Sequence, residues 1–135
     1  MNNPINVALC GLGTVGSAVF RLINDKSELF KRRFGAEIKI VAVSARNKNK
    51  ERDICLNDVA WFDDGIEMAK VSDANVVVEL VGGSEGVALE VCQKALSTGK
   101  DIVTANKALL AVHGFDLSKL ADEKSRSIGY EAAVA

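Results

Sequence analysis

The sequence predicts a doubly wound α/β fold, in which helices cover both faces of a mostly parallel β-sheet. Two observations lead to this expectation. Short apolar runs alternate with stretches of helical periodicity along the 135 residues, which is typical of parallel strands joined by crossover helices. In addition, the apolar run at residues 5–10 leads directly into Gly11-x-Gly13-x-x-Gly16 and a helical stretch. A strand, glycine turn and helix in this order indicate a Rossmann-type dinucleotide-binding domain.

The elements follow one another in a regular order. Strands are expected at residues 5–10, 38–43, 61–62, 76–81, 101–104 and 127–130. Helices are expected from the glycine turn to the basic run at 31–33 near Gly35, through Met68, over 86–97, after Lys107, and over 115–124. The basic run suits the negative end of a helix, and glycine suits its left-handed stop. Residues 46–53 are highly charged and are expected to form a solvated loop.

Composition restricts the classes of function. The length suits one domain, here an NAD(P)-binding domain over residues 1–135. A net charge of −1 from 17 basic and 18 acidic residues disfavours nucleic-acid and membrane-surface partners. No apolar run approaches the roughly 20 residues of a membrane span. Cys10, Cys55 and Cys92 are odd in number and widely spaced, unlike a disulfide framework or a zinc site, and this favours a reducing cytoplasm.

The three glycines are expected to have separate roles. Gly11 permits the tight strand-to-helix turn, Gly13 lets the backbone approach a pyrophosphate, and Gly16 lets the helix pack close to the strand. Phosphates would then lie at the helix N-terminus, where free N–H groups and the helix dipole attract negative charge. The glycine turn is therefore the first candidate site.

The end of the second strand bears on the choice of cofactor. NAD-selective enzymes often place an acid there to bind the ribose hydroxyls, but this chain has Ser44-Ala45-Arg46, with Lys48 and Lys50 following. A guanidinium can hold a 2′-phosphate through paired charged hydrogen bonds. Two interpretations of Arg46 therefore remain open. It binds the 2′-phosphate, which favours NADP or the use of both cofactors, or it belongs to a solvated basic loop.

Other strand ends carry weaker signals. Gly82 and Gly83 either let the backbone approach the ribose or nicotinamide, or form a simple turn. Lys107 follows a strand at the same sheet edge, where a cation could offset charge on a reacting oxygen, although most lysines are merely solvated. Glu79, in an apolar strand, is interpreted as structural. His113, the only histidine, precedes a glycine and is expected in a surface turn.

Several motifs together resemble the N-terminal half of homoserine dehydrogenase, in order and spacing. They are Gly11-Leu-Gly-Thr-Val-Gly16, Val76-Val-Val-Glu-Leu-Val-Gly-Gly83, Val103-Thr-Ala-Asn-Lys-Ala108, His113-Gly114 and Tyr130-Glu-Ala-Ala-Val134. The resemblance implies an oxidoreductase that interconverts L-homoserine and L-aspartate 4-semialdehyde with NAD(P)(H), in the pathway to threonine, methionine and isoleucine.

The resemblance also assigns roles to individual residues. It implies that the dinucleotide binds Gly11, Gly13, Thr14, Val15 and Gly16, with Arg46 near the adenosine phosphate or ribose. It further implies a catalytic Lys107 between nicotinamide and substrate, and a sodium-type cation site at Glu131 and the carbonyl of Val134, at the junction with a second domain.

This chain departs from the family pattern after the last motif. The family continues into a substrate-binding and dimerising domain, whereas this chain stops at Ala135. We therefore expect negligible homoserine oxidation by the isolated chain, and a homo-oligomer for the full-length family member. Two alternatives remain: a stand-alone NAD(P)-sensing module, and the same domain of a related amino-acid dehydrogenase.

Overall fold

The sheet of this protein confirms the predicted α/β class. The structure is a computed structural model that describes residues 3–82 and 86–130. In these residues six strands pair in parallel in the order β3-β2-β1-β4-β5-β6. The strands are β1 (Ile5–Cys10), β2 (Ile38–Ser44), β3 (Ala60–Phe62), β4 (Val76–Glu79), β5 (Asp101–Thr104) and β6 (Ile128–Gly129). Strand order reverses between β1 and β4, which is the point where such folds bind ligands.

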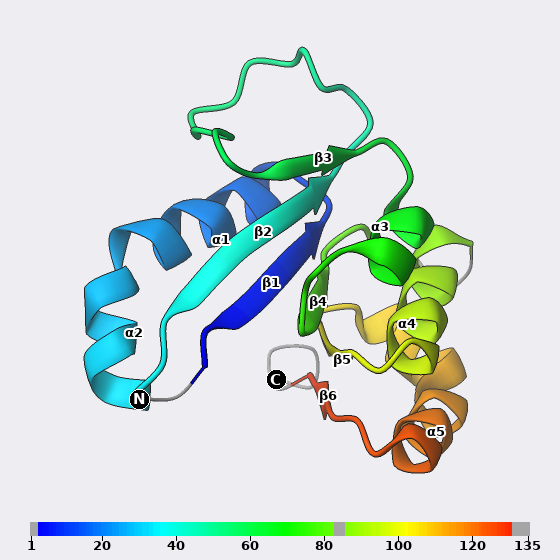
Figure 1. Ribbon diagram of the computed structural model, residues 1–135. Helices are drawn as coiled ribbons and strands as arrows, with labels where there is room; N and C mark the ends of the chain where they lie inside the picture. The colour runs from blue at the N-terminus through cyan, green and yellow to red at the C-terminus, as the bar shows by residue number, and fades with distance from the viewer. Residues whose placement is uncertain (1–2, 83–85, 131–135) are drawn as a thin grey trace.

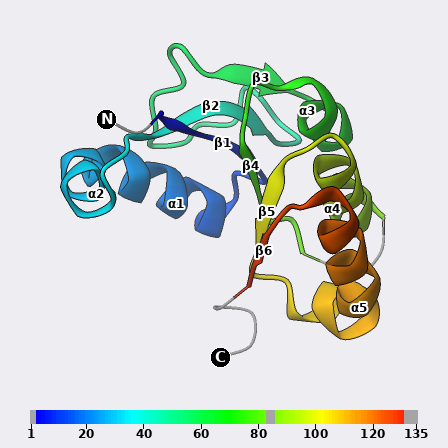
Figure 2. The same cartoon turned by 60° about the horizontal axis from the view of Figure 1, so that its bottom comes forward.

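The helices divide between the two faces of the sheet. They are α1 (Thr14–Asp25), α2 (Ser27–Phe34), α3 (Gly65–Val71), α4 (Val87–Ser97) and α5 (Lys107–Lys124). Helices α1 and α2 lie on one face, and α3, α4 and α5 lie on the other (Figures 1 and 2). Within the described residues, none of the helices combines the length and apolarity needed to cross a membrane.

Each face buries its own apolar core. On one face, Phe20 of α1 packs with Leu9 and Val43 of the central strands, and all three are at most 2% exposed. On the other face, side chains of α3, α4 and α5 cover the sheet, with Met68 and Leu96 fully buried. Burial on both faces explains why the central strands are continuously apolar.

Two helix predictions were wrong in detail. The first helix is not continuous, because it is interrupted at Lys26 between α1 and α2; the flanking Asp25 and Ser27 are weak helix formers. The opposite error occurs at the other end of the chain, where α5 is one helix through Gly114 and not two. An interior glycine costs only about 1 kcal/mol, so His113 lies inside a helix instead of in a turn.

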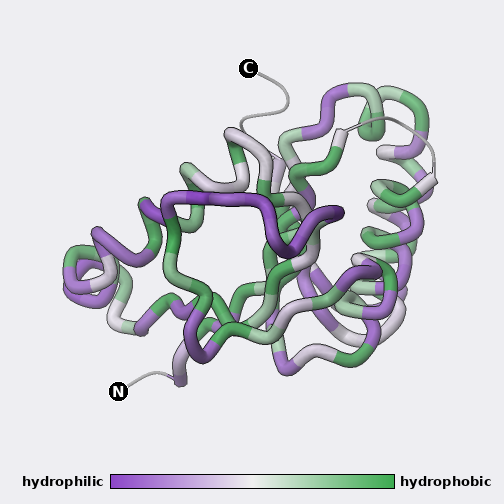
Figure 3. The backbone as a smooth tube through the Cα atoms, turned by 90° about the horizontal axis from the view of Figure 1, so that it is seen from above, coloured by the Kyte–Doolittle hydropathy of each residue, from purple (hydrophilic) through white to green (hydrophobic). Residues whose placement is uncertain are grey.

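The connection between β2 and β3 runs over the carboxyl end of the sheet, as predicted for a polar loop. The side chains of residues 46–51 are exposed to solvent. Figure 3, which looks onto this end of the molecule, shows a hydrophilic stretch crossing there. Further along the same loop, Ile54, Leu56 and Val59 pack against the core beneath α1. The loop is thus anchored at one end and solvated at the other.

Candidate cofactor-binding site

The glycine turn has the geometry that its sequence predicts. Gly11 adopts a φ of +108°, and a Cβ there would lie 3.1 Å from the backbone of Leu80. A Cβ on Gly16 would overlap the carbonyl oxygen of Gly11. In contrast, a Cβ on Gly13 would meet nothing within 4 Å. The turn therefore requires two glycines for packing and leaves open space at the third.

That open space adjoins the N-terminus of α1, which has no side-chain cap among the described residues. Gly13 is the N-cap of α1, and the first turn of the helix contains no acid. Thr14 and Val15 form the first turn and are exposed. The free N–H groups and the positive end of the dipole are thus available to an anion.

A cavity of about 600 Å³ lies beside the turn, at the point where the strand order reverses. Its walls come from the ends of β1, β2, β3 and β4 and from the first residue of α4. Cys10 to Gly13, Ser44 to Asn47 and Leu80 bring these strand ends together. The predicted site residues Gly11, Gly13 and Arg46 all line this cavity.

The basic wall of the cavity contains a residue that the sequence did not single out. Arg52 donates from Nε to the Leu12 carbonyl oxygen at 3.2 Å and from Nη1 to the Asn47 carbonyl oxygen at 2.8 Å. Its guanidinium also lies 5.5 Å from the centre of the Trp61 ring. Arg52 therefore fastens the charged loop to the glycine turn. Arg46 forms no hydrogen bond or ion pair within residues 3–82 and 86–130, and its guanidinium remains available.

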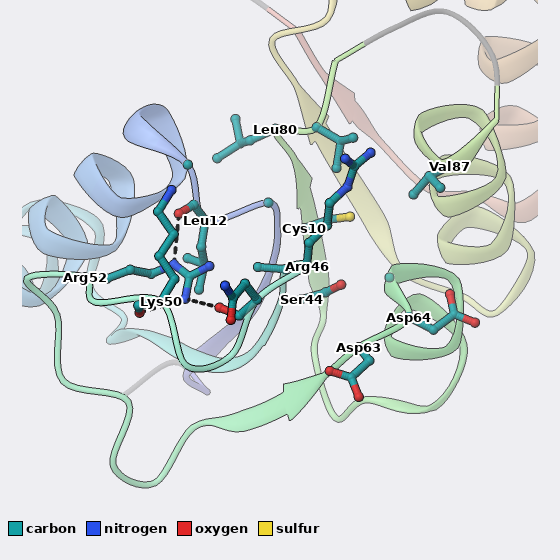
Figure 4. Close-up of a pocket in the computed structure, with 16 residues that line it drawn as sticks. Cys10, Leu12, Ser44, Arg46, Lys50, Arg52, Asp63, Asp64, Leu80 and Val87 are labelled. Carbon is teal, nitrogen blue, oxygen red and sulfur yellow. Dashed lines mark hydrogen bonds between the residues drawn. The ribbon is translucent and has the colours of Figure 1, made fainter.

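Two acids face the basic wall across the cavity, and these were also missed. Figure 4 shows Asp63 and Asp64 on the side opposite Lys50 and Arg52. Asp63 accepts a hydrogen bond from Trp61 Nε1 at 2.8 Å, and Asp64 caps α3 by accepting from the Ile66 N–H at 2.9 Å. The sequence signal was present: both acids directly follow the predicted edge strand, so parallel pairing brings them to this edge.

Lys107 lies at the same edge but outside the cavity. It is the exposed first residue of α5. The preceding residues Thr104 and Ala105 line a second, mainly apolar cavity of about 440 Å³, together with Val103 and Tyr130. Leu80 lines both cavities and separates them. The structure thus places Lys107 in a different part of the edge from Arg46.

The end of β4 makes a tight turn. Gly82 adopts a φ of +91°, and its N–H donates to Glu79 Oε2 at 3.0 Å. Gly83, Glu131 and Val134, which the sequence assigned to cofactor and cation sites, lie outside the described residues. Elsewhere in the described chain, no group of three His, Cys, Asp or Glu side chains could hold a metal ion.

Two buried thiols, Cys10 and Cys92, belong to the core on the side of α3, α4 and α5, and Cys10 also lines the cavity. Burial, followed by the negative charge of Glu79, raises the pKa of Cys10 from 9.0 to about 12. The same two causes raise the pKa of Cys92 to about 12. Both thiols stay protonated near neutral pH, so neither is a nucleophile.

Comparison with known proteins identifies the family. The sequence model described as "Homoserine dehydrogenase, NAD binding domain" matches residues 11–131. The chain belongs to this family. It is 43% identical to a homoserine dehydrogenase of Neisseria gonorrhoeae over 98% of this chain and 30% of that protein. The resemblance inferred from the motifs is thereby confirmed.

Solved structures give the same assignment. A crystal structure of S. aureus homoserine dehydrogenase superimposes with a TM-score of 0.88 at 34% identity, covering 98% of this chain and 33% of that one. A hyperthermophilic archaeal homoserine dehydrogenase in complex with NADPH has a TM-score of 0.74 at 25% identity, covering 96% of this chain and 44% of that one. The chain thus spans about a third of the length of the relatives it matches.

Proposed function

We propose that this chain is the cofactor-binding domain of an oxidoreductase that interconverts L-homoserine and L-aspartate 4-semialdehyde with NAD(P)(H). The observation that carries the proposal is the large cavity at the β1/β4 reversal, bordered by an uncapped helix and by open space over Gly13. Membership of the homoserine dehydrogenase family supplies the reaction class.

The chain's residues fit a dinucleotide in a definite direction. The first turn of α1, at Gly13, Thr14 and Val15, would hold the pyrophosphate through its free N–H groups. Arg46 would bind the adenosine end, where its free guanidinium suits a 2′-phosphate. A bound nicotinamide would supply hydride transfer, from the alcohol carbon of homoserine or to the aldehyde carbon of the semialdehyde. Gly82 and Gly83 would border that end of the cofactor.

Lys107 is proposed as the catalytic residue. Its ammonium group would bind the substrate oxygen and offset the negative charge that develops on that oxygen during hydride transfer. It begins α5 at the same edge as the cofactor site, and nothing on its own helix turn neutralises it, because the first turn has no acid. The second cavity beside it, about 440 Å³, lies at the same strand ends.

The remaining assignments belong to the longer protein. We propose that the substrate groups and dimer contacts lie in the part of the relatives that this chain does not span, that Glu131 and the Val134 carbonyl contribute to a sodium site, and that the protein is a cytoplasmic homo-oligomer. The NADPH complex of the archaeal relative supports use of NADP.

The test is steady-state oxidation of L-homoserine by the full-length protein, with NAD⁺ and NADP⁺ compared at equal concentration. We expect reduction of at least one cofactor that depends on homoserine, and negligible reduction by residues 1–135 alone. Absence of homoserine-dependent reduction by the full-length protein would contradict the proposed reaction. Efficient turnover by the isolated chain would contradict the division of the active site.

A further inference from the structure

A buried carboxylate at the end of β4 has no role in the reaction described so far. Glu79 is 1% exposed, in a strand whose other residues are all valine. Burial of a carboxylate is unfavourable unless hydrogen bonds satisfy it, and polar residues in apolar settings often mark functional positions. The hydrogen-bond partners of Glu79 therefore indicate its role.

Glu79 is hydrogen-bonded by the two segments that border the proposed nicotinamide end. Its Oε2 accepts from the backbone N–H groups of Val81 at 2.8 Å and Gly82 at 3.0 Å, which closes the turn after β4. Its Oε1 accepts from the Thr104 hydroxyl at 2.7 Å, at the end of the neighbouring strand β5. One carboxylate thus joins two strand ends.

The hydrogen bonds continue from Thr104 to the start of α5. Thr104 Oγ1 accepts from the Asn106 N–H at 3.0 Å, and Asn106 Oδ1 accepts from the Leu109 N–H at 3.0 Å and caps the helix. Thr104 is 1% exposed and Asn106 is 8% exposed, so water competes little for these bonds. Lys107 lies between Asn106 and Leu109, and its backbone is fixed by this chain of bonds.

We propose that Glu79 is a positioning residue. Together with Thr104 and Asn106, it fixes the turn after β4 relative to the start of α5, and so holds Lys107 in place beside the nicotinamide end of the cofactor site. This inference rests on the function proposed above. Because Glu79 is only 1% exposed, it would touch neither substrate nor cofactor and would act through Lys107. It therefore affects the rate of the chemical step far more than the affinity for the cofactor, whose phosphate site lies across Leu80 in the other cavity.

The decisive variant is Thr104→Val, which removes the hydroxyl at nearly constant volume. It leaves Glu79 Oε1 without its donor and the Asn106 N–H without its acceptor. In the full-length protein we expect kcat to fall about 10- to 100-fold, as for small misplacements of a catalytic group, with little change in cofactor Kd. Thr104→Ser keeps the hydroxyl and should restore most of kcat.

The matched control is Thr98→Val. Thr98 lies just before β5, at the amino ends of the strands and away from the proposed site. The Thr98 hydroxyl donates to the Lys94 carbonyl oxygen at 2.8 Å, beyond the C-terminal end of α4. This variant should keep kcat. Unchanged kcat in Thr104→Val, or an equal loss in Thr98→Val, would overturn the proposal. If Thr104→Val does not fold, Glu79→Gln provides the same comparison, because its amide nitrogen cannot accept a hydrogen bond.

Amide hydrogen exchange in residues 1–135 separates this proposal from the proposed reaction. Thr104→Val should lower the protection of the Val81 and Leu109 amides, and Thr98→Val should not. If the unvaried full-length protein does not oxidise homoserine, the proposed reaction is wrong. Hydrogen exchange alone then tests whether Glu79 and Thr104 fix the turn after β4 and the start of α5. Unchanged protection at both amides in Thr104→Val would overturn it.

Discussion

Two parts of the sheet's carboxyl edge differ in what fixes their geometry. At the ends of β1 and β2, backbone sterics dominate: Gly11 has a positive φ, Gly16 abuts the Gly11 carbonyl, and a cavity of about 600 Å³ follows. At the ends of β4 and β5, buried side chains dominate, because Glu79 and Thr104 hold the turn and the next helix.

Under the proposed function, the difference separates cofactor binding from the chemical step. A backbone cradle with an uncapped helix suits any dinucleotide phosphate, which explains why a glycine turn alone indicates so little about the reaction. At the other part, a specific chain of side-chain hydrogen bonds fixes the start of α5, where the proposed catalytic Lys107 lies. Variants in the two parts should therefore affect different measurements.

The largest effect is expected from Lys107→Ala in the full-length protein. Loss of the ammonium group should lower kcat about 100- to 1000-fold, as for removal of one group that stabilises a developing charge. Cofactor Kd should change little, because Lys107 lies outside the cavity beside the glycine turn. The matched control is Lys119→Ala, an exposed lysine on the same helix. Equal kcat in both variants would remove Lys107 from the proposed mechanism.

Gly16→Ala and Gly13→Ala should distinguish folding from binding within the first part. A Cβ at Gly16 overlaps the Gly11 carbonyl, so we expect a loss of about 1–3 kcal/mol in the free energy of unfolding. A Cβ at Gly13 meets nothing, so stability should change by less than about 0.5 kcal/mol, while cofactor affinity falls. Urea denaturation and calorimetry measure the two quantities. Undiminished cofactor binding by Gly13→Ala would argue against a phosphate at this turn.

Arg46→Ala tests cofactor preference. If the guanidinium holds the 2′-phosphate, its loss should weaken NADPH by about 1.5–3 kcal/mol, the range for charged hydrogen bonds, and leave NADH almost unaffected. Lys48→Ala is the control, since Lys48 belongs to the same loop but does not line the cavity. An equal loss for both cofactors would make Arg46 a general cation of the site without preference.

The smallest effect concerns the thiols between the two parts. The pKa values of Cys10 and Cys92 are raised to about 12 by burial and by Glu79. Since a raised pKa keeps a thiol protonated up to that pH, neither should form thiolate between pH 7 and 9. A thiol-reactive dye should then label one equivalent, at the exposed Cys55, in the folded chain, and three in denaturant. Rapid labelling of all three thiols in the folded chain at pH 8 would contradict this burial.

Much of this edge could be predicted from sequence because local patterns encode it. The strand into Gly11-x-Gly13-x-x-Gly16 and the strand at Asp101–Thr104 were located as the structure has them. Arg46, two residues after the end of β2, lies at the cavity, and its contact with the cofactor stays a prediction.

What the sequence did not reveal depends on contacts between distant residues. Arg52 bonds to Leu12, 40 positions away, and Glu79 bonds to Thr104, 25 positions away. The hydrogen-bond partners of Glu79 could not be predicted, because they depend on strand pairing that no local pattern specifies. The continuity of α5 was missed because tertiary packing, with Leu109 and Leu117 buried, outweighs the weak helix propensity of Gly114.

The most direct test of the central claim, that the β1/β4 end is an NAD(P) site, is calorimetric titration of residues 1–135 with NADPH and NADH side by side. We predict one site per chain for at least one cofactor, weakened in Gly13→Ala and retained in Thr98→Val. Absence of binding heat for both cofactors with a folded chain, or undiminished binding by Gly13→Ala, would contradict the account.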